Sequence, residues 1–150
     1  MTASTRTRHP SDSTEQVKAG DWLLAALSKR IGVELSPKQL HLRGETFIRL
    51  NGFSAAPPIL CQVTSRIGPP KVSQKHKVMS DAMKMLLARR HLDAEARCIL
   101  LFADEEAAAH FRGNSWLAQC LREFRIEVEL IELPPELAES VRSAQRRQYR

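Results

Sequence analysis

Two amide side chains, Asn51 and Gln62, occupy positions at which charge would decide the chemistry. They belong to "NGFSAAPPILCQVT", where two strand-like runs flank a proline-containing turn, so a β-hairpin would bring them close together. Carboxylates at these positions would hold Mg²⁺ for phosphodiester cleavage, with a nearby cation to orient or activate the attacking water. The attraction between two opposite charges about 4 Å apart is worth roughly 4 kcal/mol at an effective dielectric near 20. Because amides are neutral and provide no such attraction, we expect no resident metal ion and no cofactor here.

A polar ridge is expected on the helix that follows the hairpin. Gln74, Lys77, Asp81 and Lys84 are spaced three, four and three residues apart, which places them on one side of a helix. Residues 66–91 hold seven Lys and Arg against one acidic residue, whereas residues 95–140 hold ten acidic and four basic residues. The last ten residues add four arginines and no acid, and the whole chain carries a net charge of +6. This asymmetry predicts one anion-facing side, although an ordinary solvated surface would show it too.

The elements that position these residues follow from hydrophobic periodicity. A helix is expected from Asp21, as its N-cap, to Arg30, and Ser36-Pro37 indicates a turn or a short helical start. Further helices are expected at 72–90, 105–111, 116–124 and 135–147, and strands at 45–52, 57–66, 97–104 and 126–133. The apolar run "RCILLFAD" is typical of a central strand, and the alternating "IEVEL" of a strand near the sheet edge.

The resulting order, α-β-β-(β)-α-β-α-β-α, predicts a single-domain α/β fold, a three-layer sandwich with a mixed central sheet. Residues 1–19 are expected to form a disordered leader, and 20–150 one domain with a basic C-terminal tail. Cys61, Cys98 and Cys120 lie among apolar neighbours, which favours reduced thiols and a cytoplasmic location. No apolar run is long enough to span a bilayer, so no membrane partner is expected.

The stretch "LNGFSAAPPILCQVTSRIGPPKVSQKHKVMSDAMKML" resembles the restriction-endonuclease-like, or PD-(D/E)xK, superfamily. It is more closely similar to a small uncharacterised bacterial family of that kind, whose pattern has an acidic residue before Gly, a Glu on the next strand, and a helix G-x-x-K-x-x-Q-x-x-K-V-x-x-D-A-x-K-L. The residues that match the helical part are Gly68, Lys71, Gln74, Lys77, Asp81 and Lys84. The resemblance covers about 46–87, with a looser match through "LLFAD" and "AQRRQ". It implies the restriction-endonuclease-like fold and nucleic acid as a partner.

The chain departs from this pattern where catalysis would occur. The acidic position is Asn51, and the (D/E)xK triplet falls on Gln62, Val63 and Thr64. The resemblance therefore implies a degenerate site at Asn51, Gln62 and Thr64, with Lys77 as a helical lysine at the site. Lys84 or Arg66, the latter expected on the same strand face, could replace the missing cation.

The side chains expected to contact nucleic acid are Arg66, Lys71, Gln74, Lys75, Lys77 and Lys84. Each feature has a simpler interpretation beside this one. Asn51-Gly52 is a common type I′ turn pair. Gln62 is explained equally well as a satisfied polar residue between strand and helix, and the helical ridge is explained as an ordinary solvated face.

Three functions remain open. The preferred one is a nuclease-fold protein with a degraded metal site that binds nucleic acid without cleaving it. On this hypothesis the protein is not expected to be an enzyme. The second is an active Mg²⁺-dependent phosphodiesterase with a rearranged site that uses Glu34 or Glu45. The third is a homodimeric protein-interaction module, in which the acidic segment of one copy complements the basic segment of another.

Overall fold

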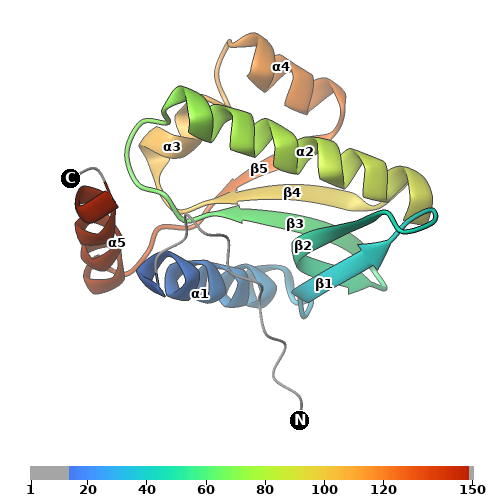
Figure 1. Cartoon of the computed structure of the whole chain (residues 1–150), viewed down its shortest axis with the longest axis horizontal. Helices are drawn as coiled ribbons and strands as arrows, with labels where there is room; N and C mark the ends of the chain where they lie inside the picture. Colours follow the sequence, from blue (N-terminus) through green and yellow to red (C-terminus); the bar gives the residue numbers. More distant parts are fainter. Residues whose placement is uncertain (1–13, 149–150) are drawn as a thin grey trace.

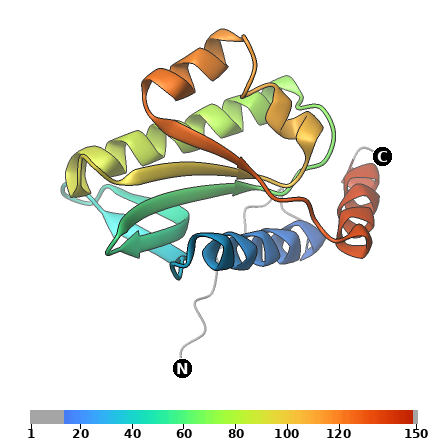
Figure 2. The same cartoon turned by 180° about the vertical axis from the view of Figure 1, so that it is seen from behind.

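A computed structural model describes residues 14–148 of the chain as five strands and five helices around one mixed sheet. Two helices, α1 (Thr14–Ile31) and α5 (Pro135–Gln148), lie on one side of the sheet. The others, α2 (Val72–Leu92), α3 (Glu105–Ala109) and α4 (Trp116–Glu123), lie on the opposite side, as Figures 1 and 2 show from two directions. The predicted three-layer α/β architecture with a mixed sheet is thereby confirmed.

The sheet has the strand order β1-β2-β3-β4-β5, with an antiparallel half and a parallel half. Its strands are β1 (Ser36–His41), β2 (Phe47–Ala55), β3 (Pro58–Thr64), β4 (Arg97–Phe102) and β5 (Ile126–Leu130). The β1–β2 and β2–β3 pairs are antiparallel, and the β3–β4 and β4–β5 pairs are parallel. The helices α2, α3 and α4 supply the crossovers that parallel pairing requires. The continuous apolar run of β4 is explained by its central place, buried on both faces as expected.

Two hydrophobic cores fill the space on either side of the sheet. Side chains of α2, including Val78 and Met85, pack with Leu60 of β3 on one side. On the other side, Leu23 of α1 and Val141 of α5 pack in a second core. Alternate residues of β3 therefore feed opposite cores, which is the period-2 pattern of a strand covered on both faces.

The structure corrects two sequence-based expectations near the N-terminal end. The helix α1 begins at Thr14, so residues 14–19 are helical rather than part of a leader, and Asp21 lies inside the helix rather than at its N-cap. Residues 36–41 form strand β1, not a turn or short helix, because pairing with β2 overrides the local signal of Ser36-Pro37. Residues 1–13, Tyr149 and Arg150 lie outside the described part of the chain.

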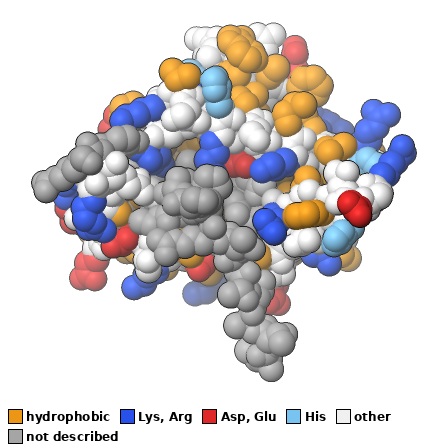
Figure 3. All heavy atoms as spheres, viewed as in Figure 1, with side chains coloured by type: hydrophobic (Ala, Val, Ile, Leu, Met, Phe, Trp, Pro, Cys, Tyr) orange, Lys and Arg blue, Asp and Glu red, His pale blue; other side chains and the backbone are white. Residues whose placement is uncertain are grey.

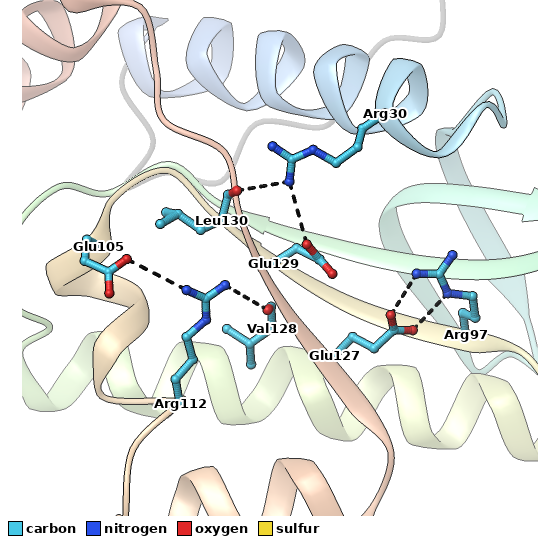
Figure 4. A network of polar contacts seen from close by, with 8 residues as sticks. All are labelled: Arg30, Arg97, Glu105, Arg112, Glu127, Val128, Glu129 and Leu130. Atoms are coloured by element: carbon cyan, nitrogen blue, oxygen red, sulfur yellow. Dashed lines mark hydrogen bonds and ion pairs between the residues drawn. The ribbon is translucent and has the colours of Figure 1, made fainter.

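The outer edge of β5 is covered by arginine side chains (Figure 4). Arg30 Nη1 donates to the Leu130 carbonyl at 3.2 Å, and Arg112 Nη2 donates to the Val128 carbonyl at 3.2 Å. Each arginine also pairs with an acid: Arg30 with Glu129 at 3.7 Å, and Arg112 with Glu105 at 3.8 Å. A third pair, the bidentate contact of Arg97 with Glu127 at 2.9 and 2.7 Å, joins β4 to β5. Acidic side chains of the segment 95–140 thus neutralise arginines of the same chain.

Within residues 14–148, no helix combines the length and the apolar character that crossing a membrane requires. Cys61 and Cys98 are buried and unpaired, and burial raises the pKa of both thiols.

Candidate functional site

A β-bulge in β2 places Asn51 beside β3. Ser36 of β1 pairs with Phe53, but Lys38 pairs with Leu50, so two steps along β1 face three steps along β2. The extra residue of β2 falls at Asn51–Gly52, and Leu50 and Phe53 both pack toward α2 although they are three residues apart. The type I′ turn interpretation of Asn51-Gly52 is therefore wrong: both residues lie within β2, and the chain reverses at 56–57.

The two amides repair the hydrogen bonding that the bulge interrupts. The regular β2–β3 ladder pairs Gly52–Ala55 with Pro58–Cys61. Beyond it, Asn51 N donates to Gln62 Oε1 at 2.9 Å, and Val63 N donates to Asn51 Oδ1 at 2.8 Å. Gln62 Nε2 donates to the Arg49 carbonyl at 3.2 Å. The expected convergence of Asn51 and Gln62 is real, and both side-chain oxygens accept a backbone N–H at that junction.

Burial explains why these bonds matter. Gln62 is only 3% exposed, and an unsatisfied polar group at that depth would cost about 1–3 kcal/mol. Thr64, the third degenerate position, is half-buried at the end of β3, where its carbonyl accepts from Ala103 N at 3.2 Å. The interpretation of Gln62 as a satisfied polar residue is thus confirmed, with backbone groups of β2 as its partners.

The helical ridge lies on the flank of α2 that is turned toward β1 and β2. Lys75 and Arg89 mark the other flank: burial, and after it the nearby Lys75 charge, lowers the pKa of His110 after α3, and Arg89 Nη2 donates to the Phe124 carbonyl after α4. Since α3 and α4 lie toward β5, and Lys77 is about 160° around the helix from Lys75, the ridge faces the opposite way. Figure 3, seen from the β1 side, shows Lys and Arg side chains spread along α2.

Within the ridge, Asp81 is the buried member. Its residue is 7% exposed, and its Oδ2 accepts from Lys77 Nζ at 3.3 Å, so the expected i,i+4 pair forms. Lys77 and Lys84 are exposed, and Lys84 forms no hydrogen bond or ion pair with the described residues. Because Asp81 is so deeply placed, the solvent-facing part of the ridge is cationic.

The predicted contact residues at the start of α2 have structural partners. Lys71 is the N-cap residue, and its backbone N–H donates to Gln74 Oε1 at 2.8 Å, which is the half of a capping box that the N3 side chain supplies. Arg66 lies in the loop after β3 rather than on the strand face where it was expected, because β3 ends at Thr64. Lys75 is half-buried beside α3, away from Lys77. The structure thus assembles Lys77, Asp81 and Lys84, and sets Lys75 apart from them.

Two residues that the sequence did not single out fix the loop between β3 and α2. Gln145 of α5 bonds both backbone groups of Ile67, with Nε2 donating to the carbonyl and Oε1 accepting the N–H, each at 2.9 Å. Asp104 Oδ2 accepts from Gly68 N at 2.9 Å and also caps α3. Their partners are 78 and 36 residues away in the chain, so no local pattern could have indicated these roles.

Two acids, Glu45 and Glu34, were considered as replacement ligands, and the structure places both on segments that adjoin β1 and β2. Glu45 lies in the turn before β2, and Asn51 is the middle residue of that strand; the stretch from Phe47 to Asn51 alone spans roughly 13 Å at about 3.3 Å per residue. Glu34 is exposed in the segment between α1 and β1. Across residues 14–148, no three His, Cys, Asp or Glu side chains gather in a group that could hold a metal ion.

Comparison with known proteins gave no match: no family model fits the chain, and no curated protein or solved structure is significantly similar to it.

Proposed function

We propose that this protein has a restriction-endonuclease-like fold with a degraded metal site, and that it binds nucleic acid without cleaving it. A mixed sheet whose β2–β3 hairpin precedes the long basic helix α2 supports the fold assignment. The observation that carries the proposal is the hydrogen bonding of the two amide side chains. Both carbonyl oxygens, Asn51 Oδ1 and Gln62 Oε1, already accept a backbone N–H. Neutral oxygens engaged in this way are poor ligands for Mg²⁺, which gives up its hydration shell reluctantly.

Binding would use the cationic flank of α2. Lys77 and Lys84 are exposed there, and the Arg66–Lys71 loop at the start of the helix is held in place by Gln145 and Asp104. A row of cations along a helix can contact successive phosphates and release their counterions, which makes affinity steeply dependent on salt.

The test measures binding of a labelled duplex and a labelled single strand at a low and a high salt concentration. We expect binding that weakens steeply with salt, and we expect Lys77→Ala/Lys84→Ala to lower the slope of log K against log salt by about 1 per lysine. The matched control is Lys18→Ala/Lys29→Ala, which removes the same charge from α1 on the other side of the sheet. Affinity that is absent at low salt, or insensitive to salt, would refute the proposal.

A cleavage assay with Mg²⁺ or Mn²⁺ separates this function from an active nuclease. The unmodified protein is expected to leave both substrates intact at concentrations that saturate binding. Strand scission that disappears in Gln62→Met, or in a variant of Glu34 or Glu45, would instead establish a rearranged phosphodiesterase site.

A further inference from the structure

The β1–β2 hairpin carries a second set of distinctive side chains, on the sheet face turned away from α2. The register pairs His41 with Phe47 and Gln39 with Arg49, so these four side chains share one face. The intervening Ile48 points to the opposite face and packs in the core beneath α2. In Figures 1 and 2 the tip of this hairpin projects past the C-terminal end of α1.

The shared face is exposed and already organised. All four side chains are exposed, and Phe47 keeps 42% of its surface in solvent. The Arg49 guanidinium lies over the Phe47 ring at 5.2 Å, and the His41 and Phe47 ring centroids are 6.0 Å apart. A planar cation, an aromatic ring and an imidazole therefore stand side by side on a rigid strand pair.

The amide side chains of Asn51 and Gln62 anchor the strand that carries this face. Gln62 Nε2 donates to the carbonyl of Arg49, and Asn51, two residues further along β2, is tied to Gln62 and Val63. The segment of β2 that carries Phe47 and Arg49 is thus fastened to β3 just where the bulge interrupts the regular ladder.

We propose that Gln39, His41, Phe47 and Arg49 form a base-stacking site for single-stranded nucleic acid. The site rests on the proposed function and specifies its partner. Aromatic rings and guanidinium planes accept any base by stacking, and the charged side chains on this face and in the adjoining turn (Arg49 and Arg43 against Glu45) favour a polyanion. In a duplex the bases are already stacked and paired, so the surface selects unpaired strands. A second copy of this chain is a poorer occupant, because it would bring the same positive charges together.

The experiment compares a single-stranded oligonucleotide with an abasic strand of the same length and phosphate count. The unmodified protein should bind the base-bearing strand several-fold more tightly. Phe47→Ala should weaken binding of that strand by about five- to tenfold, within the range known for a stacked base, and leave the abasic strand unaffected. Phe47→Trp should retain the affinity. The control, Phe124→Ala, removes a phenyl ring that is 53% exposed after α4, and it should change neither affinity.

A fluorescent base analogue gives an independent signal. A strand containing 2-aminopurine should be quenched on binding to the unmodified protein and much less by Phe47→Ala. Equal affinity for the two strands, or equal losses on both in Phe47→Ala, would overturn the stacking site while leaving phosphate binding standing. Failure of the unmodified protein to bind either single strand would overturn the stacking site, and failure to bind the duplex at low salt as well would overturn the proposed function. A change of oligomeric state in Phe47→Ala would assign the face to a second copy instead.

Discussion

At position 62 the fold needs a side chain that both donates and accepts a hydrogen bond. Oε1 accepts from Asn51 N, while Nε2 donates to the Arg49 carbonyl. A carboxylate could accept the first bond, but it would turn a second oxygen toward the Arg49 carbonyl, and the site is almost fully buried. The amide is therefore the residue type that this bulge requires, and a carboxylate of the kind that metal-dependent nucleases use would compete here with the hydrogen bonding of the hairpin.

Gln62→Glu should accordingly destabilise the protein in a pH-dependent way. We expect a loss of about 1–3 kcal/mol in the free energy of unfolding at pH 7. Burial raises the folded pKa of the new carboxyl above its unfolded value of about 4.3. The loss of stability is then smallest when the pH is below the unfolded pKa, because the protonated group can donate to the Arg49 carbonyl. It grows as the pH rises from the unfolded pKa to the folded pKa. Urea unfolding at pH 4 and pH 7 measures this, with Gln62→Met as a control whose loss should not vary with pH. A pH-independent loss in Gln62→Glu would contradict the assignment of these bonds.

Among the elements, β2 depends on a glycine for its contact with α1. A Cβ on Gly52 would lie 2.5 Å from Leu24 Cδ1 and 3.3 Å from Cys61 Cβ, so the Leu24 side chain would have to move. Gly52→Ala should cost about 1–3 kcal/mol. Combining it with Leu24→Ala, which alone should cost about 2–5 kcal/mol, should cost less than the sum because the clash disappears. Denaturant unfolding of the four proteins measures the coupling, and Gly113→Ala, with only ordinary contacts, serves as the control. Strict additivity would show that Leu24 and position 52 do not meet.

The same bulge shows where sequence patterns stop predicting this fold. Periodicity located α2 and the central strand β4, because a broad apolar helical face and an uninterrupted apolar run each have one common structural explanation. It missed β1, whose six residues include one buried side chain, Leu40, so that strand exists through its pairing with β2. It placed Asn51-Gly52 in a strand but left a type I′ turn open as an alternative, since a bulge is defined by the neighbouring strand. The convergence of Asn51 and Gln62 was predictable from a hairpin; their backbone partners were not.

For the molecule as a whole, side chains of the same chain cover part of the β5 edge of the sheet. The β5 edge is closed by Arg30 and Arg112, which bond two of its carbonyls and are themselves paired with acids (Figure 4). Unpaired strand edges invite association with other chains. In the acidic segment 95–140, Glu105, Glu127 and Glu129 contact arginines of their own chain, and the dimer hypothesis stays a prediction.

Opening that edge should make the protein associate. In Arg30→Ala/Arg112→Ala the carbonyls of Leu130 and Val128 lose their guanidinium partners, and β5 becomes a free parallel edge. Light scattering during size-exclusion chromatography should show a mass that rises with protein concentration, whereas the unmodified protein should show less of this rise. Arg97→Ala is the matched control, because Arg97 bonds the Glu127 carboxylate rather than a carbonyl of the edge. If the double variant keeps the concentration profile of the unmodified protein, or if Arg97→Ala associates equally, the two arginines do not protect this edge.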